Sequence, residues 1–171
     1  MFAPSTAEAV RSTGGWLFDQ VMAGWDVTVV ITTDCGGDPR ALHILGARVR
    51  DLDSVPASPA LGLCLRAIGV RTDVYQSDPR VRQMVRTALE GGQADVRFWG
   101  DSWPDAVPST ADRVSHRLSL AARAFKAQAM AAAAVVPAAA GAPGVPAGRD
   151  AHVEVFRRGA IRQRALPLPG D

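Results

Sequence analysis

The seven residues from Val27 to Thr33, with the sequence VTVVITT, decide the fold class of this chain. Every one of them is β-branched, and in an extended chain their apolar side chains fall on both faces. This pattern is typical of a parallel strand inside a sheet that helices cover on two sides. The chain has 171 residues, of which 47% are hydrophobic and 21% are charged. These values are typical of one globular domain.

Helical and extended patterns alternate on both sides of this strand. Upstream, Ser5 and Glu8 have the spacing of a capping box and predict a helix that ends before Gly24. Downstream, the predicted elements are a short helix, a strand near an edge, a longer helix and a further strand, at residues 41–45, 47–52, 79–91 and 95–99. The apolar residues between 61 and 68 fit a helix and a strand equally well, and we favour the helix.

The C-terminal third is expected to hold a long helix and a low-complexity tail. Residues 109–112 (STAD) resemble a second capping box and predict the start of that helix. Its expected apolar stripe consists of Val114, Leu118, Ala122 and Phe125. Residues 137–148 contain only Ala, Gly, Pro and Val, which is typical of a linker, and we expect at most one short strand beyond it, at 152–157. We therefore predict a three-layer α/β domain over residues 1–136, with three or four mostly parallel strands, and a flexible, weakly basic tail over 137–171.

Charge, cysteine content and targeting signals exclude several classes of protein. Residues 1–130 hold fourteen basic and fourteen acidic side chains, so we expect no nucleic-acid partner, because such modules carry a basic stripe. Cys35 and Cys64 do not make a disulfide scaffold or a zinc motif. The sequence shows no secretory signal and no apolar run of the ~20 residues that span a bilayer. We expect a cytoplasmic protein without a membrane partner.

Candidate ligand-binding residues lie where the predicted strands end. In open parallel sheets, ligands bind beyond the carboxyl ends of the strands. Backbone amides at a glycine pair before a helix can also approach an anion. The predicted ligand-binding residues are Asp34, Cys35, Gly36, Gly37, Arg40, Asp53 and Asp101. The aspartates among them, with Asp51, could hold Mg²⁺ if they converge. Aspartate is also a common turn residue, so we assign no metal site and identify no cofactor.

Residues 27–46 resemble the active-site loop of rhodanese-type sulfurtransferases. They comprise a strand that leads to Cys35, a short loop, and Arg40 at the start of a helix. In that family the loop amides and the positive end of the helix favour the reactive thiolate. The resemblance implies thiol chemistry at Cys35, with Arg40 as the neighbouring cation.

The remaining signals favour a protein without catalytic activity. No nucleophile, base and metal set is evident at motif spacing, so we predict a regulatory or protein-interaction module. The first alternative is a Rossmann-like domain that binds a small ligand, a nucleotide or phosphate through the loop after residue 33, and the second is the thiol chemistry at Cys35. The alanine-rich face over residues 121–134 has no evident cover within the chain, so we expect self-association or a protein partner there.

Overall fold

A seven-stranded sheet forms the centre of the molecule. The computed structural model describes residues 1–33, 37–55, 65–92, 94–100, 112–134 and 152–159. Within them the strand order is β3-β2-β1-β4-β5-β7-β6. The strands are β1 (Phe2–Ala3), β2 (Thr28–Ile31), β3 (Arg48–Asp51), β4 (Ala67–Arg71), β5 (Asp95–Trp99), β6 (Arg113–Arg117) and β7 (Val153–Arg158). The strands from β3 to β5 are parallel, whereas β7 runs antiparallel to β5 and β6 antiparallel to β7.

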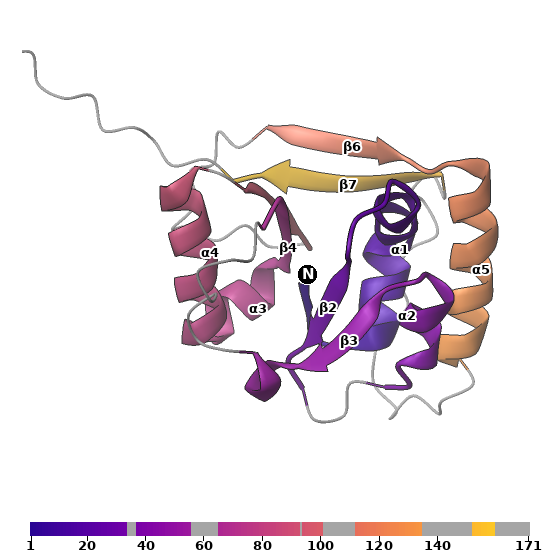
Figure 1. Ribbon diagram of the computed structural model, residues 1–171, viewed down its shortest axis with the longest axis horizontal. Coiled ribbons are helices and arrows are strands. Elements are labelled where there is room, and N and C mark those ends of the chain that lie inside the picture. Colours follow the sequence, from indigo (N-terminus) through magenta and orange to yellow (C-terminus); the bar gives the residue numbers. More distant parts are fainter. Residues whose placement is uncertain (34–36, 56–64, 93, 101–111, 135–151, 160–171) are drawn as a thin grey trace, which may run out of the picture.

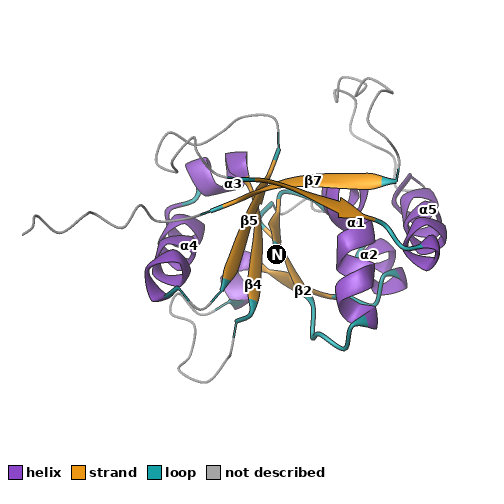
Figure 2. Cartoon of the chain, turned by 90° about the horizontal axis from the view of Figure 1, so that it is seen from above, coloured by secondary structure: helices purple, strands orange, loops and turns teal. Residues whose placement is uncertain are grey.

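Helices cover both faces of this sheet (Figures 1 and 2). On one face lie α1 (Thr6–Met22), α2 (Arg40–Ile44) and α5 (Leu120–Ala134), and on the other lie α3 (Thr72–Ser77) and α4 (Pro79–Gly91). A short 3₁₀ turn, η1 (Leu52–Ser54), follows β3. Each set of helices buries its own apolar core against the sheet, with Leu17 and Phe156 fully buried on the first face and Val85 and Phe98 on the second. The predicted α/β fold class with a mostly parallel sheet is confirmed, but the described residues form seven strands instead of the expected three or four.

Short-range signals placed several elements correctly. The Ser5 hydroxyl accepts a hydrogen bond from the Glu8 amide at the start of α1. Asp78 accepts from the amides of Arg80 and Val81 at the start of α4, and Gly92, with φ of 62°, ends that helix. The strand around Val29 is flanked by parallel neighbours, and β3 is an edge strand, as the sequence predicts.

The structure corrects the assignment between residues 61 and 77. Residues 56–64 lie outside the described residues, whereas Ile68 belongs to the strand β4 instead of a helix. The two cores cover β4 on both faces and its three central residues are buried, so its sequence does not alternate between apolar and polar residues. The prediction also missed β1, because two residues are too short to produce a recognisable pattern.

The predicted start of the last helix is also wrong. Residues 101–111 lie outside the described residues, and residues 113–117 form the strand β6. Their exposure alternates, with Arg113, Ser115 and Arg117 exposed and the residues between them half-buried, which is the period of a strand covered on one face. The helix α5 begins at Leu120, where the Ser119 hydroxyl accepts from the Ala122 amide at 3.0 Å.

Two observations concern the C-terminal third. The strand β7, which we assigned to the tail, lies between β5 and β6, so ordered structure continues beyond residue 136. The alanine-rich helix α5 packs on α1 and α2 within the chain, and Ala122 and Ala129 are fully buried. The opposite side of α5 is exposed, including Ala121, Ala124 and Ala127. Self-association through this helix stays a prediction. Within the described ranges, no helix has the length and hydropathy needed to cross a membrane.

Candidate active site

The topology brings the carboxyl ends of the five parallel strands to one edge of the sheet. From β1 the chain continues to β2 and β3 on one side, and later to β4 and β5 on the other. The order of the parallel strands therefore changes direction between β1 and β4, and crevices in α/β proteins form at such points. Three parts of the chain lie at this point: the start of α1, which follows β1, the start of α3, which follows β4, and Gly100, which follows β5.

Glu8, in the first turn of α1, is the carboxylate at the centre of this edge. Its side chain is 17% exposed, and Oε1 accepts from the Ser12 hydroxyl at 2.9 Å. Arg11, one turn away on α1, pairs with Oε2. Arg71, at the end of β4, reaches Oε1 from the other side of the edge at 3.5 Å. A carboxylate in the first turn is also favoured by the positive end of the helix.

Arg71 connects the two halves of the edge. Its guanidinium is held by Glu8 from α1 and, through Nε at 3.1 Å, by Asp73 from α3. It also lies over the ring of Trp99, at the end of β5, 5.7 Å from the ring centroid. With 24% of its side chain exposed, Arg71 is held in one orientation while part of it remains open to solvent.

Two buried polar atoms near this edge have no hydrogen-bond partner among the residues that the structure describes. They are the hydroxyl of Thr6, the first residue of α1, and the indole nitrogen of Trp99. Thr6 is 1% exposed and Trp99 4%. Buried hydroxyl and N–H groups are normally paired, so each of these atoms is an unused donor at the carboxyl end of a strand.

The predicted ligand-binding residues do not all fall within the described residues. Asp34, Cys35, Gly36 and Asp101 lie outside them. Gly37, with φ of 91°, lies beside Thr6, because a Cβ added to it would be 3.6 Å from Thr6 Cβ. Arg40 is an exposed residue at the start of α2, and the Asp53 side chain is 96% exposed and pairs with Arg80. Of the predicted set, the structure therefore brings Gly37 to the edge where Glu8 and Arg71 lie, and the function of the set stays a prediction.

Sequence reasoning missed Glu8, Arg71 and Thr6. Glu8 was interpreted only as half of a capping box, whereas its side chain contacts Arg11, Ser12 and Arg71. Recognising β1 as a strand would have placed Glu8 at a carboxyl end, but its two residues carry no visible pattern. Among the described residues, no group of three or more His, Cys, Asp or Glu side chains could hold a metal ion.

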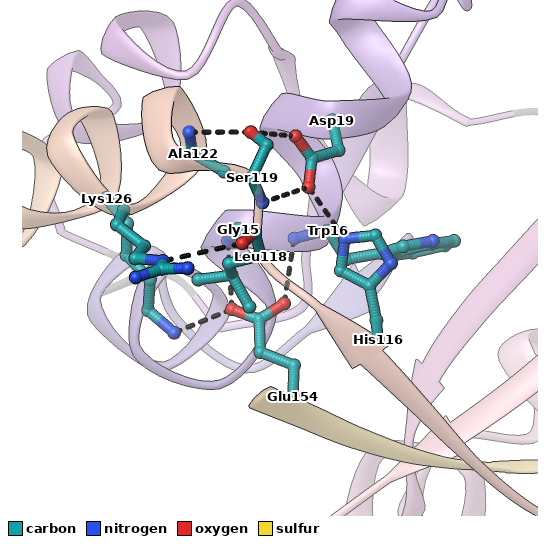
Figure 3. A network of polar contacts seen from close by, with 10 residues as sticks. Gly15, Trp16, Asp19, His116, Leu118, Ser119, Ala122, Lys126 and Glu154 are labelled. Atoms are coloured by element: carbon teal, nitrogen blue, oxygen red, sulfur yellow. Dashed lines mark hydrogen bonds and ion pairs between the residues drawn. The ribbon is translucent and has the colours of Figure 1, made fainter. Parts of the chain in front are cut away.

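A second polar network lies away from this edge and joins α1, β6, α5 and β7 (Figure 3). Glu154 of β7 is buried, and its two oxygens accept from the amides of Gly15 and Trp16 at 2.9 and 2.8 Å. Lys126 of α5 also donates to it, at 2.6 Å. Every partner in this set is a protein group, so the network holds secondary structure together and is not a vacant site.

Asp19 forms the other half of the same network. Its carboxylate accepts from His116 Nε2 at 2.8 Å, from the Ser119 amide at 3.2 Å and from the Ser119 hydroxyl at 2.6 Å. Burial raises the pKa of Asp19, but the hydrogen bonds from Ser119 and His116 outweigh that effect and lower it below the usual 3.8. Asp19 therefore fixes the junction between β6 and α5 as a charged group.

Comparison with known proteins identifies the fold. No protein-family model matches this chain, and no curated protein matches it. The A40926 pseudoaglycone deacetylase Dbv21 is similar in structure, with a TM-score of 0.61, 17% identity, and coverage of 92% of this chain and 94% of that one. A triple mutant of a deacetylase involved in the teicoplanin biosynthetic pathway has a TM-score of 0.54 and 15% identity, over 92% of this chain and 95% of that one. The structure of a deacetylase–teicoplanin complex has a TM-score of 0.54 and 13% identity, over 93% and 96%.

These comparisons correct the functional expectation. All three structures are of deacetylases, which contradicts a regulatory or protein-interaction module without catalytic activity. None is described as a nucleotide-binding Rossmann-like domain or as a sulfurtransferase, so those alternatives are contradicted as well. The absence of a familiar motif misled the prediction, because a site assembled from distant residues needs no motif.

Proposed function

We propose that this chain is a hydrolase that removes an acyl group, such as acetyl, from its substrate. The reaction takes place at the edge of the sheet where Glu8 and Arg71 lie. The observation that carries the proposal is the ion pair between Glu8 of α1 and Arg71 of β4, at the point where the strand order changes direction. The likeness to deacetylases over nearly the whole chain supports the reaction class. Enzymes with open α/β sheets bind their ligands at this kind of edge.

Glu8 supplies the acid–base group in this proposal. Water attacks the carbonyl carbon of the acetyl group and gives a proton to the Glu8 carboxylate, forming a tetrahedral oxyanion. The bond from that carbon to nitrogen or oxygen then breaks, the proton passes from Glu8 to the leaving atom, and acetate is released. General acid–base catalysis by a positioned carboxyl contributes about 10²–10⁴-fold to such a reaction.

Arg71 acts on Glu8 as a positioning residue. It contacts Glu8 Oε1 at 3.5 Å while Asp73 and Trp99 fix the other parts of its side chain. This arrangement holds the carboxylate in one orientation, and a misplaced catalytic group loses much of its effect. Replacing Arg71 should therefore lower kcat more than it raises KM.

Release of acetate is the measurement that tests this proposal. The substrates are the A40926 pseudoaglycone, teicoplanin, N-acetylglucosamine and p-nitrophenyl acetate, which together offer amide and ester bonds. We expect the wild-type chain to release acetate from at least one of them, and Glu8→Gln to lower kcat by about 10²-fold or more. Arg71→Met should lower kcat by a smaller factor.

The matched controls come from an exposed ion pair on α4. Arg86 and Glu90 lie 3.7 Å apart and are about 60% exposed, so Glu90→Gln and Arg86→Met change the same residue types away from the edge. Both controls should keep wild-type kcat. The proposal fails if the wild-type chain releases no more acetate from any substrate than the heat-inactivated chain does. It also fails if Glu8→Gln and Glu90→Gln have equal activity.

A further inference from the structure

The helix α5 lies at the outside of the molecule, beyond α1 and α2 (Figures 1 and 2). One side of it packs on those two helices, where Ala122 and Ala129 are fully buried. The opposite side is open to solvent. Its exposed residues follow one another at intervals of four and three, and they are Leu120, Ala124, Ala127, Ala131 and Ala134. We call these five residues the outer seam, because this spacing keeps side chains in line along one side of a helix.

None of the exposed residues of α5, a helix that the structure describes in full, is charged. The two charged residues of the helix are held by the chain itself: Lys126 donates to Glu154 at 2.6 Å, and Arg123 donates to a backbone carbonyl at 3.4 Å. The helix α4 shows the usual composition, since its exposed residues include Arg86 and Glu90. A helix that is apolar on all sides is normally buried, so the outer side of α5 has the composition of a covered surface.

Large apolar side chains lie on the open side of α5 as well as small ones. Leu120, the first residue of the outer seam, is 80% exposed. Phe125 and Met130, on either side of the seam, are 45% and 37% exposed. Of the six large hydrophobic side chains that are exposed among the described residues, α5 therefore carries three. Apolar side chains that gather on a surface in this way mark a site of protein interaction.

The outer seam is complementary to itself. Its spacing is that of helices that pack along one another, and its alanines allow two backbones to approach closely. In an antiparallel pair, Leu120 of each copy meets the alanine end of the other helix, at Ala131 and Ala134, so that large side chains pack against small ones at both ends. Because the seam has no charge, two identical faces meet without bringing like charges together or burying an unpaired charge.

We propose that the outer seam of α5 binds the same seam of a second copy of this chain, in an antiparallel dimer with two-fold symmetry. A two-fold axis near Ala127 brings the same residues of both copies together, as in most homodimers. The 15 residues of α5 extend over about 22 Å. A contact along one helix of this length is small for a stable interface, so the dimer dissociates on dilution. This inference does not depend on the proposed hydrolysis.

Sedimentation velocity of the full chain over a wide range of protein concentration tests the dimer. The wild-type chain should pass from monomer to dimer as its concentration rises. Ala127→Glu should stay monomeric, because the dimer would place two carboxylates against each other. Ala127 is exposed and glutamate is a good helix former, so the variant should keep the unfolding midpoint of the wild-type monomer. Gln83→Glu, at an exposed position of α4, is the matched control and should dimerise like the wild-type chain.

A mixture of two variants tests whether the partner is a second copy of the same face. Ala127→Lys alone should also stay monomeric. An equal mixture of Ala127→Glu and Ala127→Lys should form the dimer again, because opposite charges then meet near the two-fold axis. The proposal is overturned if the wild-type chain stays monomeric at the highest concentration, if Ala127→Glu dimerises as the wild-type chain does, or if the mixture stays monomeric.

Discussion

Single residues in α1 show how strongly tertiary contacts can reverse a local preference. Gly14 and Gly15 weaken a helix by sequence criteria, because glycine is about 1 kcal/mol less favourable than alanine in a helix interior. In the structure, Gly15 lets Leu118 pack directly against the helix backbone, and its amide donates to Glu154. The glycine is therefore required for the contact between α1 and the β6–α5 junction.

Replacing Gly15 should destabilise the protein despite the gain in helix propensity. A Cβ at this position would lie 2.2 Å from Leu118 Cγ, and Leu118 is 2% exposed and cannot move freely. We expect Gly15→Ala to lower the free energy of unfolding by about 1–3 kcal/mol, the usual effect of overpacking, as measured by urea denaturation. Gly91→Ala is the matched control, because nothing lies within 4 Å of its added Cβ, and it should be neutral or slightly stabilising. Equal effects of the two substitutions would contradict this interpretation.

At the scale of elements, the helix α5 begins where a residue of α1 fixes its first turn. Ser119 accepts from the Ala122 amide, while Asp19 of α1 binds both the amide and the hydroxyl of Ser119 and also His116 of β6. These contacts form across about one hundred residues of sequence. An N-terminal cap of this kind cannot be recognised from the local sequence, because half of it comes from another helix.

This cap should make stability depend on pH through Asp19. Its pKa is lower in the folded protein than the usual 3.8, so its contribution is present in full above about that pH and is lost as the pH falls through the folded pKa. We expect Asp19→Asn to be less stable than the wild-type chain at pH 7, and the difference to shrink as the pH falls below 3.8.

Urea denaturation from pH 7 to 2.5 measures that difference. Asp26→Asn is a suitable control, because Asp26 forms an exposed pair with Arg48 and exposed pairs contribute about 0–1 kcal/mol. A difference between wild type and Asp19→Asn that stays constant over the whole range would show that the Asp19 charge is not what stabilises the junction.

For the whole molecule, the strand β7 connects the parallel part of the sheet to the edge strand β6. It pairs with β5 on one side and with β6 on the other. Its residues Phe156 and Glu154 are buried against α1, where the Phe156 ring lies 5.3 Å from that of Trp16. The first face of the sheet is therefore incomplete without a segment from near the end of the chain.

A chain that ends at residue 136 should not fold cooperatively. It loses the partner of β6, the Glu154 acceptor, and a Phe156 side chain whose removal alone costs about 3–5 kcal/mol, against a total stability of about 5–15 kcal/mol for an ordinary domain. Circular dichroism during urea denaturation should show a broad, weak transition for residues 1–136 and a sharp one for the full chain. A sharp transition with the same midpoint in both would instead support a domain boundary at residue 136.

The sequence alone determined the features whose causes lie within a few residues. The β-branched run at Val29, the caps at Ser5 and Asp78 and the helix end at Gly92 carry their own signals, so the α/β class followed from them. Part of the candidate site was within reach too, since Gly37 was singled out beside a strand end.

Only the tertiary structure decided what depends on distant partners. The two residues of β1 form a strand because β2 and β4 pair with them. The short strand expected at 152–157 lies between β5 and β6, a place that its own sequence does not indicate. Glu8 becomes a candidate acid–base group only when Arg71 is brought to it, and Glu154 reaches an amide 139 residues away. Local sequence cannot specify these contacts, because each depends on where the rest of the chain has folded.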